Sequence, residues 1–480
     1  MTRDSASSTV GAPQAGAPDE LCRLAATELV AAYAARRLSP VDVTTAVLER
    51  VRRLNPGLAA FYLVEDDGAM AAARASEARW MRGAPMGPLD GVPVSIKDSI
   101  AVAGRPMYRG SKAYAPAAPS PVDAPPAARL REAGGIFLGK TTMPDLGCLA
   151  SGISSQHGTA RNPWNLARTP GGSTSGGAAA VAAGLGPLTV GTDLGGSVRI
   201  PAAFCGLVGL KPTQGRIPHI PASSMRSAGP LARSVADVIL MTAVLSRPDR
   251  RDCLSLPFPP PPAPAAEAPE QVVRGARIGL LLDAGAGMPA GPETRAAVEQ
   301  AGRLLETHGA TVEPMPALLP EDAEWAVETY FRARALSELQ HLPSDRRPEA
   351  HAEVQRWCAG AEGLSAADLL EAMNGLDRLR VKVNDAFAGF DFVLSPVMPM
   401  TAYDADIAFP DRDRAWSHLL FTAAYNQTQQ PALSVPCGFD RDGLPIGLQI
   451  IGQRFADQAL LRLAAAFESL RGQPARLPAL

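Results

Sequence analysis

Apolar positions along the chain follow two spacings, and each spacing predicts a different element. Between residues 20 and 82 they recur every three to four positions, which predicts helices over 20–37, 39–55 and 66–82. Ser39 followed by Pro40 marks the second start, because serine caps a helix and proline fits its first turn. Short apolar runs at 91–98 and 136–139, on either side of a helix that ends near Gly134, predict buried strands.

The same alternation returns in the second half of the chain. Apolar runs predict strands at 277–282, 311–312, 392–396, 432–436 and 447–452, with helices at 292–309 and 457–470. Together these elements predict an α/β fold: a central mixed, mostly parallel twisted sheet covered by helices on both faces. The mostly helical stretch at about 321–390 is inserted between core strands and is predicted to form a wall of a pocket. Its aromatic residues are each interpreted as core positions: Trp325, Tyr330, Phe331, Trp357 and Phe387.

Composition sets the boundaries around this core. Residues 1–19 are rich in Ser, Ala, Gly and Pro without an apolar run, so they predict a disordered leader rather than a signal peptide. Residues 20–480 are expected to form a single domain, with a Pro/Ala-rich surface linker at 254–268. No apolar stretch is long enough to cross a bilayer, so no membrane partner is expected.

Charge and cysteine usage narrow the protein class further. The formal net charge of −2 gives no electrostatic reason to expect nucleic acid as a partner. Six cysteines are scattered without a C-x-x-C pair, which argues against a zinc site and a disulfide scaffold. A reducing compartment, by default the cytoplasm, is the expected location.

Two glycine-flanked serines and one lysine carry the candidate chemistry. Ser173 and Ser197 are separated by a small, apolar segment at 176–185 that predicts a helix buried on every side. Serines in such turns can have backbone N–H groups beside the hydroxyl, as an oxyanion site requires, although a phosphate-binding loop or two ordinary turns have the same composition. Lys97 interrupts the apolar run 91–98, and a buried lysine with a lowered pKa can serve as a base. Lysine and two serines suffice to activate a nucleophile without histidine.

The segments 91–98 and 169–216 together resemble the amidase signature family. The shared features are G-G-S, a small apolar helix and G-T-D-x-G-G-S-V-R-I-P-A, and the similarity extends through 139–143 and 430–436. The resemblance implies the amidase signature fold and amide hydrolysis by a Ser–cis-Ser–Lys triad. In it Lys97 is the base, Ser173 relays the proton across a cis Gly172–Ser173 bond, and Ser197 is the nucleophile. The doublet Thr174-Ser175 departs from the serine and glycine of many members, and little effect on the chemistry is expected from it.

The resemblance also implies the rest of the site. Backbone N–H groups of Leu194, Gly195, Gly196 and Ser197 are expected to form the oxyanion hole, and no metal or cofactor is implied. The expected substrate-binding residues are Gly147, Cys148, Leu149, Thr192 and Asn426.

Three neighbours of the triad are expected to have other roles. Asp193 and Arg199 are expected to hold the nucleophile turn through an ion pair or backbone hydrogen bonds. His157 is expected to hydrogen-bond within its loop rather than act as a base, since neither serine sits in a G-x-S-x-G elbow.

The leading functional prediction is a stand-alone amidohydrolase that cleaves the C–N bond of a small-molecule amide, such as an aryl amide, anilide or carbamate. A homodimer is the oligomeric state considered for it. The first alternative is the glutaminase-type subunit of a tRNA-dependent amidotransferase. Members of that type carry a loop similar to M-G-S-S-T-E-N-S, whereas residues 146–152 read L-G-C-L-A-S-G, which favours the first prediction. The second alternative is a non-catalytic scaffold of the same fold, which the intact set of Lys97, Ser173 and Ser197 disfavours.

Overall fold

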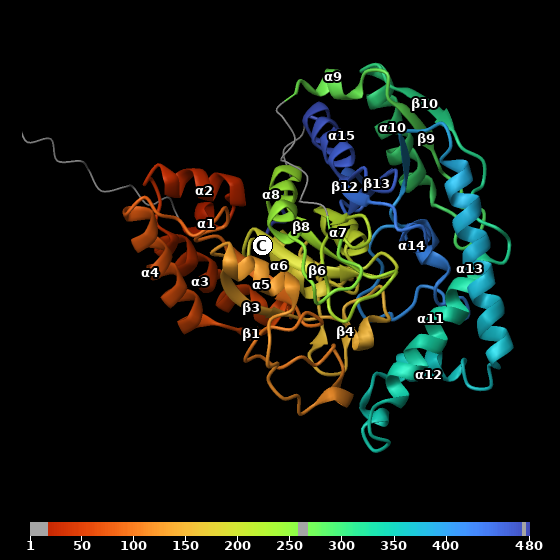
Figure 1. Ribbon diagram of the computed structural model, residues 1–480, viewed down its shortest axis with the longest axis horizontal. Coiled ribbons are helices and arrows are strands. Elements are labelled where there is room, and N and C mark those ends of the chain that lie inside the picture. The colour runs from red at the N-terminus through yellow and green to blue at the C-terminus, as the bar shows by residue number, and fades with distance from the viewer. Residues whose placement is uncertain (1–17, 258–266, 473–476) are drawn as a thin grey trace, which may run out of the picture.

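A single large sheet runs through the centre of the molecule. The computed structural model describes residues 18–257, 267–472 and 477–480 (Figure 1). Eleven strands join in the order β1-β3-β2-β6-β8-β7-β12-β13-β11-β9-β10. Parallel pairs link β3, β2 and β6 near one end and β11, β9 and β10 at the other, with antiparallel pairs between them and at β1. The predicted mixed sheet with flanking helices is therefore confirmed.

The strands of this sheet come from both halves of the chain. They are β1 (Phe61–Val64), β2 (Pro93–Lys97), β3 (Ile136–Thr141), β6 (Leu188–Asp193), β7 (Val208–Lys211), β8 (Ser227–Ala232), β9 (Arg277–Leu280), β10 (Thr311–Pro314), β11 (Phe392–Pro396), β12 (Ala432–Phe439) and β13 (Pro445–Gly452). A separate hairpin pairs β4 (Ile153–Ser154) with β5 (Gly158–Thr159).

Helices pack on both faces of the sheet. α5, α8, α10 and α15 share one core with the strands, and α6 and α7 pack in another. The helices are α1 (Pro18–Leu21), α2 (Ala26–Ala34), α3 (Pro40–Leu58), α4 (Asp66–Met81), α5 (Pro125–Glu132), α6 (Ser175–Ala182), α7 (Arg199–Cys205), α8 (Val235–Leu245), α9 (Pro269–Val273), α10 (Pro292–Thr307), α11 (Ala323–Gln340), α12 (Ala352–Ala359), α13 (Ala366–Ala386), α14 (Leu420–Gln427) and α15 (Asp457–Leu470).

The helix α6 is buried on every side, as its small apolar composition predicts. All of its residues are buried. The packing is so close that a Cβ atom on Gly176 would lie 2.2 Å from the carbonyl oxygen of Ala60. This close approach places the residues just before the helix, Ser173 among them, against the ends of the central strands.

The N-terminal helix differs from the prediction because a distant carboxylate divides it. Asp237 of α8 accepts hydrogen bonds from the backbone N–H groups of Ala26 and Thr27, both at 2.9 Å, and so fixes the start of α2. Such a cap comes from a residue more than 200 positions away and has no local signal. The predicted start of α3 is confirmed, since Ser39 Oγ accepts from the N–H of Val41 at 3.0 Å.

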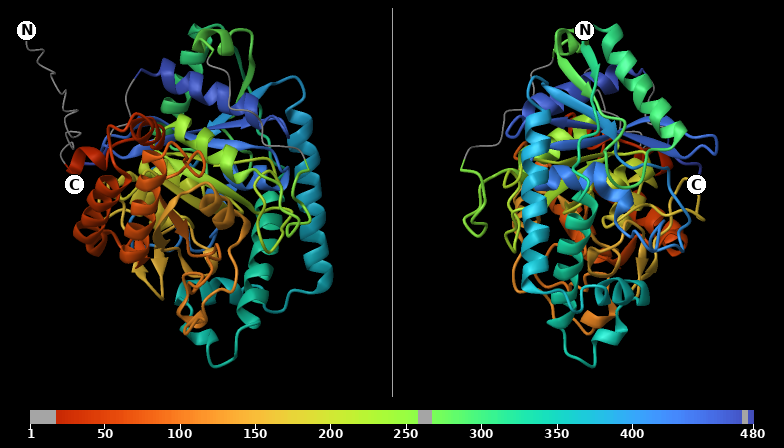
Figure 2. Two further views of the ribbon diagram at one scale, coloured as in Figure 1. Left: turned by 60° about the vertical axis from the view of Figure 1, so that its left-hand side comes forward. Right: turned by 90° about the vertical axis from the view of Figure 1, so that its right-hand side faces the viewer.

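Helices α11, α12 and α13 form the predicted insertion between core strands. Figures 1 and 2 show them on the opposite side of the molecule from α2–α4. Elements β1, β7, β8, α7 and α8 were not predicted from the sequence. The predicted leader at 1–19 and linker at 254–268 lie largely outside the described residues, although Pro18 and Asp19 begin α1. Within the described ranges, no helix combines the length and apolar character needed to cross a membrane.

Candidate active site

Lys97 and Ser173 lie in direct hydrogen-bond contact at the end of strand β2. The Lys97 ammonium nitrogen Nζ is 2.9 Å from Ser173 Oγ, and the Lys97 side chain is fully buried. Thr174 Oγ1 and Thr192 Oγ1 lie at 3.2 Å from the same nitrogen, and the carbonyl oxygen of Thr192 lies at 3.3 Å. Among the described residues, no carboxylate forms a hydrogen bond or ion pair with the amine, so its neighbours are compatible with a neutral amine.

Burial holds the pKa of Lys97 well below its ordinary value. The nearby carboxylate of Asp193 opposes this shift, whereas the positive charges of Arg226 and Arg109 add to it. An amine with a lowered pKa can accept a proton from Ser173 near neutral pH.

The two serine turns are joined to each other through Thr174. The Gly172–Ser173 peptide bond is cis, as the family resemblance implies. The backbone N–H and the hydroxyl of Thr174 donate to the carbonyl oxygen of Ser197, at 3.1 and 2.5 Å. Ser173 and Ser197 line one cavity, so the structure brings together the three residues predicted for the triad.

Three of the four backbone groups predicted for the oxyanion hole are available in the nucleophile turn. Among the described residues, no acceptor is bonded to the N–H groups of Leu194, Gly195 and Ser197. The N–H of Gly196 instead donates to Asp193 Oδ1 at 2.9 Å, so its predicted place in the hole is wrong. The local composition cannot distinguish these groups, because the difference depends on where the Asp193 side chain folds back.

A buried ion pair supports this turn from below. Arg199 Nη2 and Nε lie 2.8 and 3.0 Å from the two carboxylate oxygens of Asp193, and neither side chain is exposed. Burial by itself would raise the pKa of Asp193, but the Arg199 guanidinium holds it well below its usual range. The predicted structural role of both residues is confirmed.

Asn426 belongs to this support and not to the substrate cavity. Its amide nitrogen donates to Asp193 Oδ1 at 2.9 Å and to the carbonyl oxygen of Met225 at 3.1 Å, while its amide oxygen accepts from Arg199. The prediction of Asn426 as a substrate-binding residue is therefore wrong.

The cavity beside the serines contains three of the remaining predicted residues. Gly147, Cys148 and Thr192 line it, whereas Leu149 is 2% exposed and packs into the core, which corrects its predicted role. A set of charged and aromatic residues from distant segments completes the lining and was not predicted to do so: Arg109, Arg226, Phe331, Arg334, Glu338, Trp357 and Trp416.

An aromatic wall closes one side of this cavity. Trp416 stacks on Phe331 with ring centres 4.5 Å apart and on Trp357 with ring centres 5.5 Å apart. Phe331 and Trp357 were interpreted as core positions, and the structure shows that they also face the cavity. Residues of α11 and α12 therefore form part of the cavity wall, whereas none of the described residues of α13 lines it.

His157 lies apart from this cavity. Its ring stacks on Tyr62 with centres 4.3 Å apart and meets the edge of Tyr108, and its Nε2 is 4.0 Å from Asp98 Oδ2. The backbone N–H of His157 donates to Ser154 Oγ at 3.0 Å, so the residue hydrogen-bonds within its loop as expected, while its ring packs against the two tyrosines and does not line the cavity of the serines.

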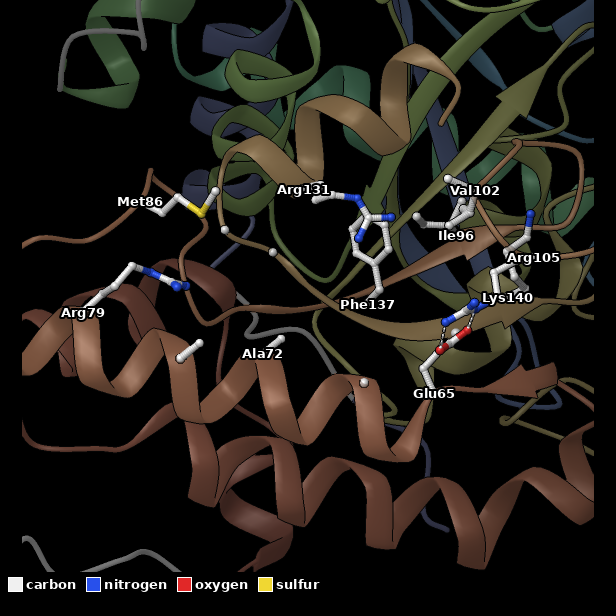
Figure 3. A pocket seen from close by; sticks show the side chains of 16 residues that line it. Glu65, Ala72, Arg79, Met86, Ile96, Val102, Arg105, Arg131, Phe137 and Lys140 are labelled. Atoms are coloured by element: carbon white, nitrogen blue, oxygen red, sulfur yellow. Dashed lines mark hydrogen bonds and ion pairs between the residues drawn. The ribbon is translucent and has the colours of Figure 1, made fainter. Parts of the chain in front are cut away.

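A larger cavity lies elsewhere, between α4 and strand β3 (Figure 3). Its volume is about 320 Å³, against about 60 Å³ for the cavity at the serines. Arg105 pairs there with Glu65, and the guanidinium of Arg131 lies 4.6 Å from the ring centre of Phe137. None of the three predicted triad residues lines it, so the smaller cavity is the candidate active site.

Comparisons with known proteins identify the relatives of this arrangement. Residues 42–461 match the sequence model of the family described as Amidase. One glutamyl-tRNA(Gln) amidotransferase subunit, from Symbiobacterium thermophilum, is 36% identical over 95% of this chain and 99% of its own length. The corresponding protein from Acidothermus cellulolyticus is 37% identical over 94% and 95%.

Two solved structures with the same fold are those of amidases. A bacterial aryl acylamidase of the amidase signature family has a TM-score of 0.86 at 28% identity, covering 95% of this chain and 98% of its own. The peptide amidase of Stenotrophomonas maltophilia has a TM-score of 0.79 at 29% identity, covering 95% and 99%.

The curated relatives contradict the leading functional prediction. The prediction of a stand-alone hydrolase of small-molecule amides, with no nucleic acid among its partners, is wrong by this comparison. The curated relatives with 36% and 37% identity over 99% and 95% of their own length are amidotransferase subunits, whereas the two amidases of known structure are only 28% and 29% identical. The prediction relied on the divergent loop at 146–152. Identity at more than a third of the positions over the full length is stronger evidence of relationship than a difference in one loop of seven residues.

Proposed function

Because the chain belongs to the amidase family and is an amidohydrolase, we propose that it is the glutaminase-type subunit of a tRNA-dependent amidotransferase. In this role it releases ammonia from the side-chain amide of glutamine and passes it to a partner subunit that amidates glutamyl-tRNA. The observation that carries this proposal is the 36% identity to one component of such an enzyme over 99% of that component's length.

Acylation begins with the buried amine. Neutral Lys97 takes the proton of Ser173, and Ser173 in turn takes the proton of Ser197. The Ser197 oxygen forms a bond to the amide carbon, and the carbonyl electron pair moves to the oxygen. The N–H groups of Leu194, Gly195 and Ser197 stabilise that oxyanion, and removal of one such donor costs about 10²–10³ in turnover.

The leaving amine must be protonated, and the same relay supplies that proton in the reverse direction. Ser173 gives its proton to the amide nitrogen and regains one from Lys97, so the C–N bond breaks with ammonia as the leaving group. Water then attacks the acyl group on Ser197 by the same relay, releases glutamate and restores the free serine. The neutral state of Lys97 is recovered in each half-reaction.

The partners in this proposal are the other amidotransferase subunits and glutamyl-tRNA, and the location is the cytoplasm. The six cysteines are all free thiols, which suits a reducing compartment.

The test is glutamine turnover in three mixtures: the chain alone, the chain with the partner subunits of a related amidotransferase, and that complex with glutamyl-tRNA(Gln) and ATP, which activates the carboxylate that ammonia converts to an amide. We expect ammonia release to rise when the subunits are added and glutaminyl-tRNA to form in the third mixture. The Ser197→Ala variant is the matched control, and it should assemble with the subunits while forming no product.

The proposal is overturned by the opposite pattern. If glutamine is untouched in all three mixtures while the chain alone cleaves other amides, the chain does not belong to an amidotransferase.

A further inference from the structure

Two arginine side chains face the active-site cavity without a partner. Arg226 and Arg334 both line the cavity that contains Ser173 and Ser197. Within the described part of the chain, neither guanidinium has a hydrogen-bond or ion-pair partner. Guanidinium groups in partly buried positions are normally paired, because desolvation of an unpaired charge is costly.

The nearest carboxylate of the cavity is already committed elsewhere. Glu338 pairs with Arg109, whose Nε and Nη2 lie 2.7 and 2.9 Å from the two carboxylate oxygens. The hydroxyl of Tyr114 donates to the same group at 3.0 Å. Glu338 therefore offsets the charge of Arg109, and although its carboxylate also attracts Arg226, three arginines against one glutamate leave the described lining of the cavity with an excess of positive charge.

These two charges also repel each other. Burial lowers the pKa of Arg226 to about 10, and the charge of Arg334 is the largest electrostatic contribution in the same direction. A site that holds two like charges together before any ligand arrives favours an anion between them.

Rigid elements fix the backbone positions of both arginines. Arg226 immediately precedes β8, whose first residue, Ser227, pairs with Asp193 at the end of β6. Its carbonyl oxygen also accepts a hydrogen bond from Gln214 at 3.0 Å. Arg334 lies on α11 one turn from Phe331 and one turn from Glu338, so these residues share the helix face that lines the cavity.

We propose that Arg226 and Arg334 bind a carboxylate of the amide substrate, so that the site selects amides that carry an anionic group at the end remote from the scissile bond. Guanidinium forks match a carboxylate in shape and charge. The choice of glutamine as the natural amide rests on the proposed function. The assignment of the two arginines rests on the cavity itself.

The test compares two amides that differ only in this group. Glutaramate is a five-carbon primary amide with a terminal carboxylate, and valeramide is the same chain with a terminal methyl group. Binding of each to the full chain carrying Ser197→Ala is measured by calorimetry, so that neither is consumed. We expect glutaramate to bind about 10- to 100-fold more tightly, the range for hydrogen bonds to a charged group.

The same ratio is then measured with Arg226→Gln or Arg334→Gln added. Each is expected to reduce the preference for glutaramate to less than about threefold, while Arg334→Lys, which keeps the charge, retains part of it. Arg74→Gln on α4 is the matched control: it removes one exposed positive charge far from the cavity and should leave the ratio unchanged. Thermal unfolding of each variant confirms that it is folded.

An equal affinity for the two amides, or a preference that survives both glutamine substitutions, overturns the assignment. If the arginines served only to lower the pKa of Lys97, the substitutions would move the pH profile of turnover and leave the binding ratio intact. The binding assay uses substrates without the α-amino group of glutamine and needs no partner subunit. A negative result in it can therefore be distinguished from a failure of glutamine-dependent transfer. A preserved ratio without transfer contradicts the proposed function alone.

Discussion

Lys97 Nζ lies 2.9 Å from Ser173 Oγ in a position that solvent does not reach. Since the amine is held by hydroxyl and carbonyl oxygens rather than by a carboxylate, its proton affinity is set mainly by burial.

Replacement of Lys97 by methionine should leave a folded but almost inactive protein. The substitution keeps the side-chain length and removes the base, so kcat should fall about 10²–10⁴-fold. Lys97→Arg should fail as well, because a guanidinium stays protonated. Turnover of glutamine by the complex measures the effect, with circular dichroism as the check on folding. Substantial activity in either variant contradicts the role of Lys97 as base.

The pH dependence of kcat/KM should show an acid limb set by Lys97. The protonated amine cannot accept a proton, so activity is lost as the pH falls through the lowered pKa of Lys97. Arg226 contributes to that lowering, so Arg226→Gln should raise the pKa and move the limb to higher pH. Arg74→Gln should leave the limb in place, and a shift in the acid direction for Arg226→Gln would contradict the account.

Loss of one partner of the buried pair Asp193–Arg199 should cost far more stability than loss of a surface pair. Arg199→Met leaves the Asp193 carboxylate buried and unpaired, so the free energy of unfolding should fall by about 3–5 kcal/mol in urea titrations. Arg441→Gln removes the exposed contact with Glu293, which solvent screens, and should leave the free energy of unfolding almost unchanged. Equal losses would mean that the turn does not depend on the pair.

Gly147→Ala and Gly158→Ala separate backbone strain from damage to the site. Both glycines have a left-handed φ, +71° and +77°, so alanine should cost each a similar amount of stability, about 1 kcal/mol. A Cβ atom on Gly147 would lie 3.2 Å from Ser173 Oγ, whereas one on Gly158 would have no atom of the described residues within 4 Å apart from its own chain neighbours. Activity should therefore fall about 10- to 100-fold only in Gly147→Ala. Similar activity in the two variants would show that Ser173 tolerates displacement.

The sequence was sufficient for the parts of the site that lie within one continuous motif. Ser173, Ser197 and the buried helix between them are local, and Lys97 is conspicuous because it interrupts an apolar strand. The mixed sheet followed from the alternation of strands and helices, although the antiparallel pairs at β7 and β8 had no recognised signal.

Residues that meet only through tertiary folding could not be predicted in the same way. Arg226, Arg334 and Trp416 come from three separate segments, and nothing near any of them marks a cavity. Asn426 was placed near the substrate from its position in the chain, while its actual hydrogen bonds depend on Asp193. Hydrogen bonding within the turn likewise decided the role of Gly196.

The most direct test of the account is the covalent intermediate on Ser197. The complex is quenched in acid during glutamine turnover, digested and analysed by mass spectrometry, with Ser173→Ala and Ser197→Ala treated in parallel. The account predicts a glutamyl ester on the peptide that contains Ser197 and none in the Ser197→Ala protein. A glutamyl group on Ser173, or turnover that continues without any adduct in the Ser197→Ala protein, would contradict it.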